Sequence, residues 1–218
     1  MQPVRMIYVK EGRVRYLSHL DQNRVFQRAV MRSRLPLWVT EGFHPHVYLN
    51  FLRPIGLGIE SEYELCDFKL PEGFDLGEAR ERLNEQLPEG FFVREVYLPE
   101  QKAAEIGYKD VSITLTPESG TTDHLSEAVD AFLAQPSILV EKKGKKNTVT
   151  VDLRQVVELL EKTAREHSLN CLLRLPAAQE GAVSPLLWAE ACRTFLQRPV
   201  RFLCRLTVVR NQQKAVFR

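Results

Sequence analysis

The sequence predicts an α+β protein built from two tandem ferredoxin-like units packed together, each with the element order β-α-β-β-α-β. Two observations lead to this fold class. Short segments with alternating apolar residues are separated by segments with helical periodicity, and this order occurs twice along the chain. We place the first unit at residues 1–103 and the second at residues 104–218.

The first unit begins with a strand at Arg5–Lys10, which places Met6, Tyr8 and Lys10 on one side. Ser18 and Asp21 form a helix N-cap box, so a helix is expected from residue 19 to 34, ending before a proline. Further strands are expected at residues 37–40 with 47–52, 62–70 and 91–98, and a second helix at residues 75–87. The second strand is interrupted around residues 41–46.

The second unit shows a similar order without a similar sequence. Strands are expected at residues 110–116, 137–142, 148–153, 169–175 and 200–210. A turn at residues 143–147 joins the second and third of these strands into a hairpin. Helices are expected at residues 122–134, 153–163 and 184–196, the last opened by a serine followed by proline.

Composition excludes several classes of protein. Hydrophobic residues make up 44% of the chain and charged residues 27%, as in ordinary globular proteins. No apolar run approaches the roughly 20 residues of a membrane span, and the N-terminus lacks a secretory signal pattern, so a cytoplasmic location is expected. The four cysteines form no CxxC pair that would hold zinc or an iron–sulfur cluster. We therefore expect no metal and no cofactor.

Charge is distributed unevenly along the chain. Residues 1–53 contain nine Lys and Arg against three Asp and Glu, whereas residues 54–105 contain five against thirteen. A basic segment beside an acidic one indicates an anionic partner on one side of the protein. The alternative is that these charges are solvated or pair internally.

Three arginines in the basic segment recur at helical spacing. Arg24, Arg28 and Arg32 are four residues apart and therefore lie along one face of the expected helix; we call them the arginine row. Guanidinium groups at this spacing suit a polyanionic backbone such as that of RNA. The alternative is a solvated basic face without a ligand. Further arginines expected on neighbouring strand ends or loops, and counted as binding candidates, are Arg13, Arg15 and Arg53.

Three of the five histidines lie close to this basic segment. His19 is expected at a helix N-terminus, while His44 and His46 flank a proline in a short loop that also contains Phe43. Together with Asp21 the histidines are candidates for a metal site or for general acid–base catalysis on RNA. Phe43 is a candidate for stacking on a base, or a core residue.

One dense run of residues resembles a known family signature. The matching positions are Arg15, Ser18, His19, Leu20, Asp21, Arg24, Arg28, Ala29, Arg32, Leu35, Pro36, Leu37, Gly42, Phe43, Pro45, Leu49, Phe51, Gly56, Gly58, Ser61 and Glu64. They resemble a family of uncharacterised bacterial domains that are fused to, or encoded beside, radical-SAM proteins. The resemblance is sharp over residues 5–70. Two departures, Val47 in place of a proline and Arg53 before Pro54, indicate an altered rim of the site.

The resemblance implies a radical-SAM protein as partner but names no reaction. Our first hypothesis is a non-catalytic RNA-binding or substrate-presenting protein that works with that enzyme. The second is a metal-independent RNA-processing enzyme that uses His19, His44 or His46. The third is a protein adaptor that binds a radical-SAM protein through the acidic segment and binds no nucleic acid.

Overall fold

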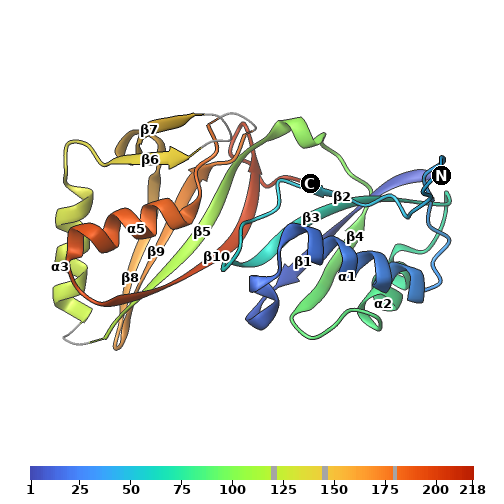
Figure 1. Ribbon diagram of the computed structural model, residues 1–218, viewed down its shortest axis with the longest axis horizontal. Helices are drawn as coiled ribbons and strands as arrows, with labels where there is room; N and C mark the ends of the chain where they lie inside the picture. The colour runs from blue at the N-terminus through green and yellow to red at the C-terminus, as the bar shows by residue number, and fades with distance from the viewer. Residues whose placement is uncertain (119–121, 144–146, 179–180) are drawn as a thin grey trace. The chain divides into compact units, whose positions relative to one another are not determined.

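The computed structural model describes residues 1–118, 122–143, 147–178 and 181–218, and it confirms an α+β fold (Figure 1). The chain forms two compact units, which are described separately below. The first contains Met1–Glu105 and Val216–Arg218, and the second contains Ile106–Ala215. The final three residues, placed in the second unit from the sequence, thus belong to the first. Within the described part of the chain, no helix is long and apolar enough to span a membrane.

The first unit is an antiparallel sheet with two helices on one face (Figure 1). Its main elements are β1 (Gln2–Lys10), α1 (His19–Arg32), β2 (Asn50–Leu52), β3 (Glu60–Leu70), α2 (Leu76–Asn84) and β4 (Phe91–Tyr97), with 3-10 turns at Gly12–Tyr16 and Ala103–Glu105. The strand order is β4-β1-β3-β2, and every neighbouring pair is antiparallel.

The start of α1 confirms the predicted N-cap. The Ser18 side chain accepts a hydrogen bond from the backbone N–H of Asp21 at 3.1 Å, and its hydroxyl donates to the Asp21 carboxylate at 2.6 Å. These bonds satisfy one of the free amides of the first turn and place a negative charge at the positive end of the helix dipole. The helix ends at Arg32, two residues before the predicted end.

The strand predicted at residues 37–40 and 47–52 is much shorter than expected. Only Asn50–Leu52 forms a strand, and Val39 and Val47 are joined by an isolated antiparallel bridge. The N–H of Trp38 donates to the carbonyl of Lys69 in β3, and the N–H of Tyr48 donates to the carbonyl of Trp38. The chain around residues 38–48 therefore pairs mainly with itself and forms no continuous strand.

The second unit is a four-stranded antiparallel sheet with a separate hairpin. Its elements are β5 (Ile106–Pro117), α3 (Thr122–Leu133), β6 (Leu139–Lys143), β7 (Thr148–Asp152), α4 (Leu153–Val156), β8 (Glu158–Arg165), β9 (Ser168–Pro176), α5 (Pro185–Leu196) and β10 (Val200–Asn211). The strand order is β10-β5-β9-β8, whereas among the described residues β6 and β7 pair only with each other. The predicted turn at 143–147 includes residues 144–146, which lie outside the described residues.

The helix predicted at residues 153–163 is wrong. A single helical turn, α4, is followed by the edge strand β8, and a tight connection pairs Arg165 with Ser168 of β9. The sequence of β8, ELLEKTAR, places Leu159, Leu160, Thr163 and Ala164 at helical spacing, and pairing with β9 overrides this pattern. Consequently β8, and not the hairpin β6–β7, lies beside β9 in this sheet.

Each unit has its own interior. In the first, Phe26 of α1 packs against the rings of Tyr8, Phe51 and Phe91, with ring centroids 4.8–5.4 Å away. In the second, Phe132 of α3 packs edge-on against Trp188 of α5 at 5.5 Å. The four cysteines are free and buried, as expected for reduced core residues.

Replacing Phe26 with alanine should destabilise the protein by about 3–5 kcal/mol, because a fully buried ring is lost and a cavity remains among three aromatic neighbours. The measurement is the free energy of unfolding in denaturant. Met31→Ala on the same helix is the control, because Met31 is 71% exposed and should change stability by no more than about 0.5 kcal/mol. Equal effects of the two substitutions would contradict this description of the interior.

Candidate functional site

The arginine row lies on the exposed face of α1. Arg24, Arg28 and Arg32 are all exposed, while the opposite face of the helix buries Phe26 and Val30. Arg24 forms a surface ion pair with Asp21 at 3.1 Å, and Arg32 donates to the carbonyl of Gln86 at 2.7 Å. Exposed pairs of this kind contribute little free energy, so both guanidinium groups remain accessible to an anion.

The other three candidate arginines have different surroundings. Arg15 donates to the buried carboxylate of Glu60 at 3.0 Å and to the hydroxyl of Tyr16 at 2.8 Å, so its role is structural in this state. Arg53 is partly buried, has a left-handed backbone conformation with φ 49°, and interacts with other residues of the chain. Arg13 lines a cavity of about 540 Å³ at the end of β1. The cavity is lined by Glu11, Gly12, Arg13, Glu60, Glu89 and Gly90.

This cavity does not suit a phosphate. Three of its lining residues are glutamates, and only one is an arginine. Their carboxylates oppose the charge of Arg13 and repel an anion. Arg13 is therefore a weaker candidate for contact with RNA than the arginine row.

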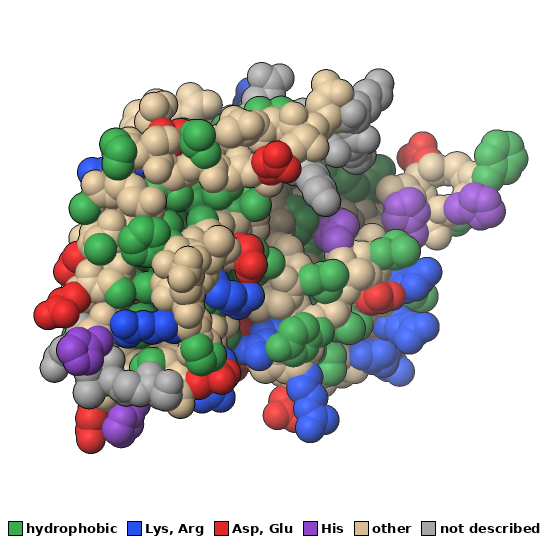
Figure 2. Space-filling view, turned by 60° about the vertical axis from the view of Figure 1, so that its left-hand side comes forward, with side chains coloured by type: hydrophobic (Ala, Val, Ile, Leu, Met, Phe, Trp, Pro, Cys, Tyr) green, Lys and Arg blue, Asp and Glu red, His purple; other side chains and the backbone are tan. Residues whose placement is uncertain are grey.

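Residues 41–46 form an exposed projection that we call the tip (Figure 2). The Phe43 side chain is fully exposed, with a relative accessibility of 102%. Hydrogen bonds join Thr40 to His46. The backbone N–H of Thr40 donates to the carbonyl of His46 at 2.8 Å, and the Thr40 hydroxyl oxygen lies 3.1 Å from Nδ1 of the His46 ring. Gly42 adopts φ 125°, which a residue with a side chain rarely does. The tip is thus tied at its base and presents an aromatic ring to solvent.

The chain just before and after the tip is held by a cation and two rings. Trp38 and Tyr48 pack edge-to-face at 5.7 Å, and the ammonium of Lys69 lies 4.2 Å from the Trp38 ring centroid. Such a contact contributes about 0.5–1 kcal/mol at an exposed site. It anchors the projection to β3, which carries Lys69.

The three candidate histidines occupy two different environments. His19 is the first residue of α1 and packs edge-on against Phe51 at 5.5 Å, whereas His44 and His46 belong to the exposed tip. Within the described ranges, no hydrogen bond, ion pair or ring contact joins His19 to either of the others. No cluster of three or more His, Cys, Asp or Glu side chains suitable for a metal ion occurs among the described residues. The hypothesis of a metal site with Asp21 therefore has no support from the geometry.

A group of buried polar side chains lies beneath the N-terminal half of α1. We call Tyr8, Lys10, Gln22 and Glu64 the polar cluster; each is at most 2% exposed. Gln22 donates to the hydroxyl of Tyr8 at 2.6 Å, and that hydroxyl donates to Glu64 Oε2 at 3.4 Å. The backbone N–H of Ile55 also donates to Oε2 at 3.3 Å. The other oxygen of Glu64, Oε1, is buried and has no hydrogen-bond partner among the described residues.

The pairing of β1 with β3 brings this cluster together. Tyr8 lies opposite Glu64 and Lys10 opposite Ser61, with an irregularity in the register between the two pairs. Such irregularities redirect side chains and often occur beside functional sites. The ring of Phe51, which contacts His19, also lies 6.0 Å from the ring of Tyr8.

Burial changes the proton affinity of the cluster. Desolvation lowers the pKa of Lys10, and the charge of Glu64 opposes this shift only in part. Burial, followed by the negative charge of Glu64, raises the pKa of Tyr8 well above its usual range. At the surface, the hydrogen bond from Ser18 lowers the pKa of Asp21, with a further contribution from Arg24. A lysine with a lowered pKa beside a carboxylate and a phenol is an arrangement able to transfer protons.

The polar cluster is not among the sites predicted from the sequence. One signal was present, because the alternation of β1 places Lys10 on the same side as Met6 and Tyr8. A lysine on the core face of a strand is unusual and is a reason to look for a function. Glu64 and Gln22 could not be joined to it from the sequence, because the contacts depend on strand register and helix packing.

The comparison with protein families places this chain in a family. The model of a family described as uncharacterised proteins conserved in bacteria, DUF2344, matches residues 4–185. The chain belongs to this family. The matched region of this DUF2344 protein includes the arginine row, the tip and the polar cluster. No curated protein matches the chain.

The polar cluster of the DUF2344 protein should lower its stability. Replacing the buried pair by uncharged side chains, Lys10→Met with Glu64→Gln, should raise the free energy of unfolding by about 1–4 kcal/mol at pH 7, because two desolvated charges are removed. The pKa of Lys10 is lowered in the folded state, so the unfolded state binds more protons at neutral to alkaline pH. The contribution of Lys10 to this gain should therefore shrink as the pH rises to the ordinary pKa of lysine.

Urea denaturation at pH 7 and pH 10 measures this difference. Lys102→Met is the matched control, since Lys102 is exposed and its removal should change stability by no more than about 0.5 kcal/mol at either pH. A double variant that is less stable than the natural protein at pH 7 would show that the cluster is a net source of stability. A gain that is independent of pH would show that the charge of Lys10 does not contribute to it.

Proposed function

We propose that this protein is a non-catalytic RNA-binding accessory protein of a radical-SAM enzyme, and that it contacts single-stranded RNA through the tip and the arginine row. The observation that carries the proposal is the fully exposed ring of Phe43, held at the end of a tied projection in the same unit as the arginines. An exposed aromatic ring together with a basic helix face matches the two requirements of single-strand binding, stacking and phosphate contact.

The arginine row supplies the phosphate contacts. Its three guanidinium groups are exposed on successive turns of a helix, and each can donate two hydrogen bonds to a phosphate. Arg28 and Arg32 lie toward the C-terminal half of α1, while Arg24 is one turn from the N-terminal end. Positive charge along the helix face steers an anionic chain toward the unit.

The tip supplies a stacking platform. Phe43 buries no area in the protein, so its exposure costs solubility without adding stability. Stacking of a base on this ring would bury apolar surface, and such contacts contribute about 1–3 kcal/mol each in single-strand complexes. His44 and His46 flank the ring and are themselves exposed, so they provide hydrogen-bonding groups for a base or phosphate at the same place.

The radical-SAM partner is proposed from the resemblance of residues 5–70 to domains associated with such enzymes. A binding protein without a catalytic group of its own requires an enzyme to act on the RNA that it holds. The acidic segment 54–105 belongs to the same unit as the arginine row and is the surface proposed for that partner. The basic arginine row would then attract RNA, and the acidic segment would attract the enzyme.

We further infer that both units are ferredoxin-like. In the first, the order β4-β1-β3-β2 and the element order β-α-β-β-α-β support this reading. In the second, the order β10-β5-β9-β8 supports it if β6, β7 and α4 are regarded as an insertion between α3 and β8. Sheets of this type occur in modules that bind single-stranded RNA, although the fold alone does not specify function.

A second candidate function, RNA processing, is favoured by the polar cluster beside His19. Phe51 contacts both His19 and Tyr8, so an exposed imidazole and a buried phenol–carboxylate–lysine group lie around one ring. Incubating labelled RNA with the purified protein distinguishes the two functions. Products that disappear in a His19→Ala variant would replace the accessory function by an enzymatic one; unchanged RNA supports the accessory function.

Substitution of the arginine row should weaken RNA binding. Arg24→Ala, Arg28→Ala and Arg32→Ala should each lower affinity for single-stranded RNA and reduce the slope of log K against log salt by about one phosphate contact or less. Fluorescence anisotropy over a range of salt concentrations measures both quantities. Arg80→Ala is the control, because Arg80 is an exposed arginine of α2 outside the row. Unchanged affinity in all three variants would remove the row from the interface.

Substitution at the tip should weaken binding without a change of salt dependence. Phe43→Ala should cost about 1–3 kcal/mol of RNA-binding free energy, since stacking is lost while the phosphate contacts remain. Phe92→Ala provides a matched control at an exposed phenylalanine of β4 that is 53% accessible. If both variants bind RNA as the natural protein does, the tip has another function and a protein adaptor becomes the better description.

A further inference from the structure

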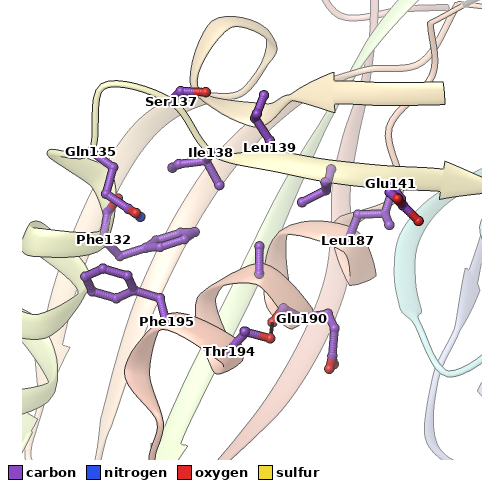
Figure 3. Close-up of a pocket in the computed structure, with 12 residues that line it drawn as sticks. Phe132, Gln135, Ser137, Ile138, Leu139, Glu141, Leu187, Glu190, Thr194 and Phe195 are labelled. Carbon is purple, nitrogen blue, oxygen red and sulfur yellow. Dashed lines mark hydrogen bonds between the residues drawn. The ribbon is translucent and has the colours of Figure 1, made fainter.

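The second unit contains a groove that the RNA-binding proposal does not use. A cavity of about 440 Å³ lies between the start of β6, one side of α5 and the end of α3 (Figure 3). The lining residues are Phe132, Gln135, Ser137, Ile138, Leu139, Val140, Glu141, Leu187, Glu190, Ala191, Thr194 and Phe195. All of them belong to the second unit.

One wall of the groove is the edge of a strand. Five consecutive residues, 137–141, line it, although side chains of successive strand residues point to opposite faces. Consecutive strand residues can line the same groove when the groove runs along the edge of the strand, where the backbone N–H and C=O groups point. Within the described residues, β6 has a single strand neighbour, β7, so the edge that faces the groove carries backbone groups without a strand partner.

The facing wall is one side of a helix. Leu187, Glu190, Ala191, Thr194 and Phe195 have the spacing of residues on one helical face. A groove between a free strand edge and a helix face is the geometry in which extended peptides bind by adding a strand to a sheet. Backbone hydrogen bonds along the edge then provide affinity, and side-chain subsites provide specificity.

The side chains of the groove define two kinds of subsite. Phe132 and Phe195 contact each other at 5.5 Å and lie at one end, where Phe195 remains 40% exposed (Figure 3). Glu141 lies at the other end and is exposed (Figure 3). The Glu190 carboxylate is paired with Arg193 at 2.9 Å, so Glu141 is the acidic group at that end. An occupant that fits both ends carries an apolar side chain and, further along, a lysine or arginine.

The two ends of this chain are engaged elsewhere. Phe217 is fully buried in the first unit, and Arg218 pairs with Glu95 there. At the other end, Gln2 already belongs to β1. The occupant of the groove is therefore not a terminal segment seen in this structure.

We propose that the groove between β6 and α5 binds an extended segment of a partner protein, which adds to β6 as a third strand. An apolar side chain of that segment packs on Phe132 and Phe195, and a basic side chain meets Glu141. The backbone groups of β6 that face the groove bond to the added strand, which covers an edge that proteins otherwise protect against unwanted pairing. The surface is independent of the RNA interface, because all its residues belong to the second unit.

A short peptide of alternating valine and lysine is the probe for this site. It should bind the full-length protein in fluorescence anisotropy, and it should slow hydrogen exchange of the backbone amides at residues 139–141. The same peptide with N-methylated alternate amides should bind at least about tenfold more weakly, because it lacks the donors for strand addition. Equal binding of the two peptides would overturn the proposal.

Two variants test the side-chain subsites. Phe195→Glu should reduce peptide affinity at least about tenfold, while Leu186→Glu on the same helix, outside the groove and 45% exposed, should leave it unchanged. Glu141→Lys, at an exposed position, should weaken the lysine peptide and strengthen a peptide of alternating valine and glutamate. Melting temperatures verify that each variant is folded.

Two results would contradict the proposal. Unchanged affinity in both Phe195→Glu and Glu141→Lys would show that the peptide binds elsewhere. A natural protein that is dimeric in sedimentation, and monomeric after Phe195→Glu, would assign the groove to a second copy of this chain.

Discussion

The antiparallel pairing of β1 with β3 is the constraint on which the first unit depends. It joins residues more than fifty positions apart in the chain, Tyr8 with Glu64 and Met6 with Cys66. Beneath α1 this pairing builds both the apolar interior around Phe26 and the polar cluster, and the two meet at Tyr8. Hydrophobic burial stabilises the apolar part, while the polar cluster contains ionisable groups that burial disfavours. The apolar packing of α1 therefore offsets the free-energy cost of the polar cluster beneath the same helix.

The exposed candidate sites, which are the arginine row and the tip, differ from the buried polar cluster in how their charged and polar groups are solvated. The arginine row and the tip reduce the stability of the fold little. Water solvates the guanidinium groups, and hydrogen bonds between Thr40 and His46 hold the tip locally. They suit a ligand that binds and leaves, with affinity set by salt and stacking. The polar cluster is held in a low-dielectric interior, where a lysine and a glutamate are expensive to keep. Proton transfer is the chemistry that the lowered pKa of Lys10 and the raised pKa of Tyr8 permit beside the Glu64 carboxylate.

The second unit orders its strands in a similar way and adds a hairpin outside its sheet. Asp110, which is 3% exposed, holds the strands β5, β9 and β10 together through ion pairs with Arg174 and Arg210. The hairpin β6–β7 has no such role in the sheet, so one of its edges remains available beside α5. An added element with a free edge is a natural place for a partner, because binding there leaves the sheet undisturbed.

The sequence by itself determined the local features of this protein. The cap at Ser18, the length of α1 within two residues, the spacing of the arginine row and the hairpin β6–β7 follow from periodicity, capping and turn chemistry, which act between near neighbours. The sequence did not show that residues 158–165 form a strand, since their spacing is helical and only pairing with β9 decides. It also did not show that His19 packs on Phe51, or that Lys10 shares an interior with Tyr8, Gln22 and Glu64. These depend on strand register and helix packing, which join residues distant in the chain, and only the tertiary structure specifies them.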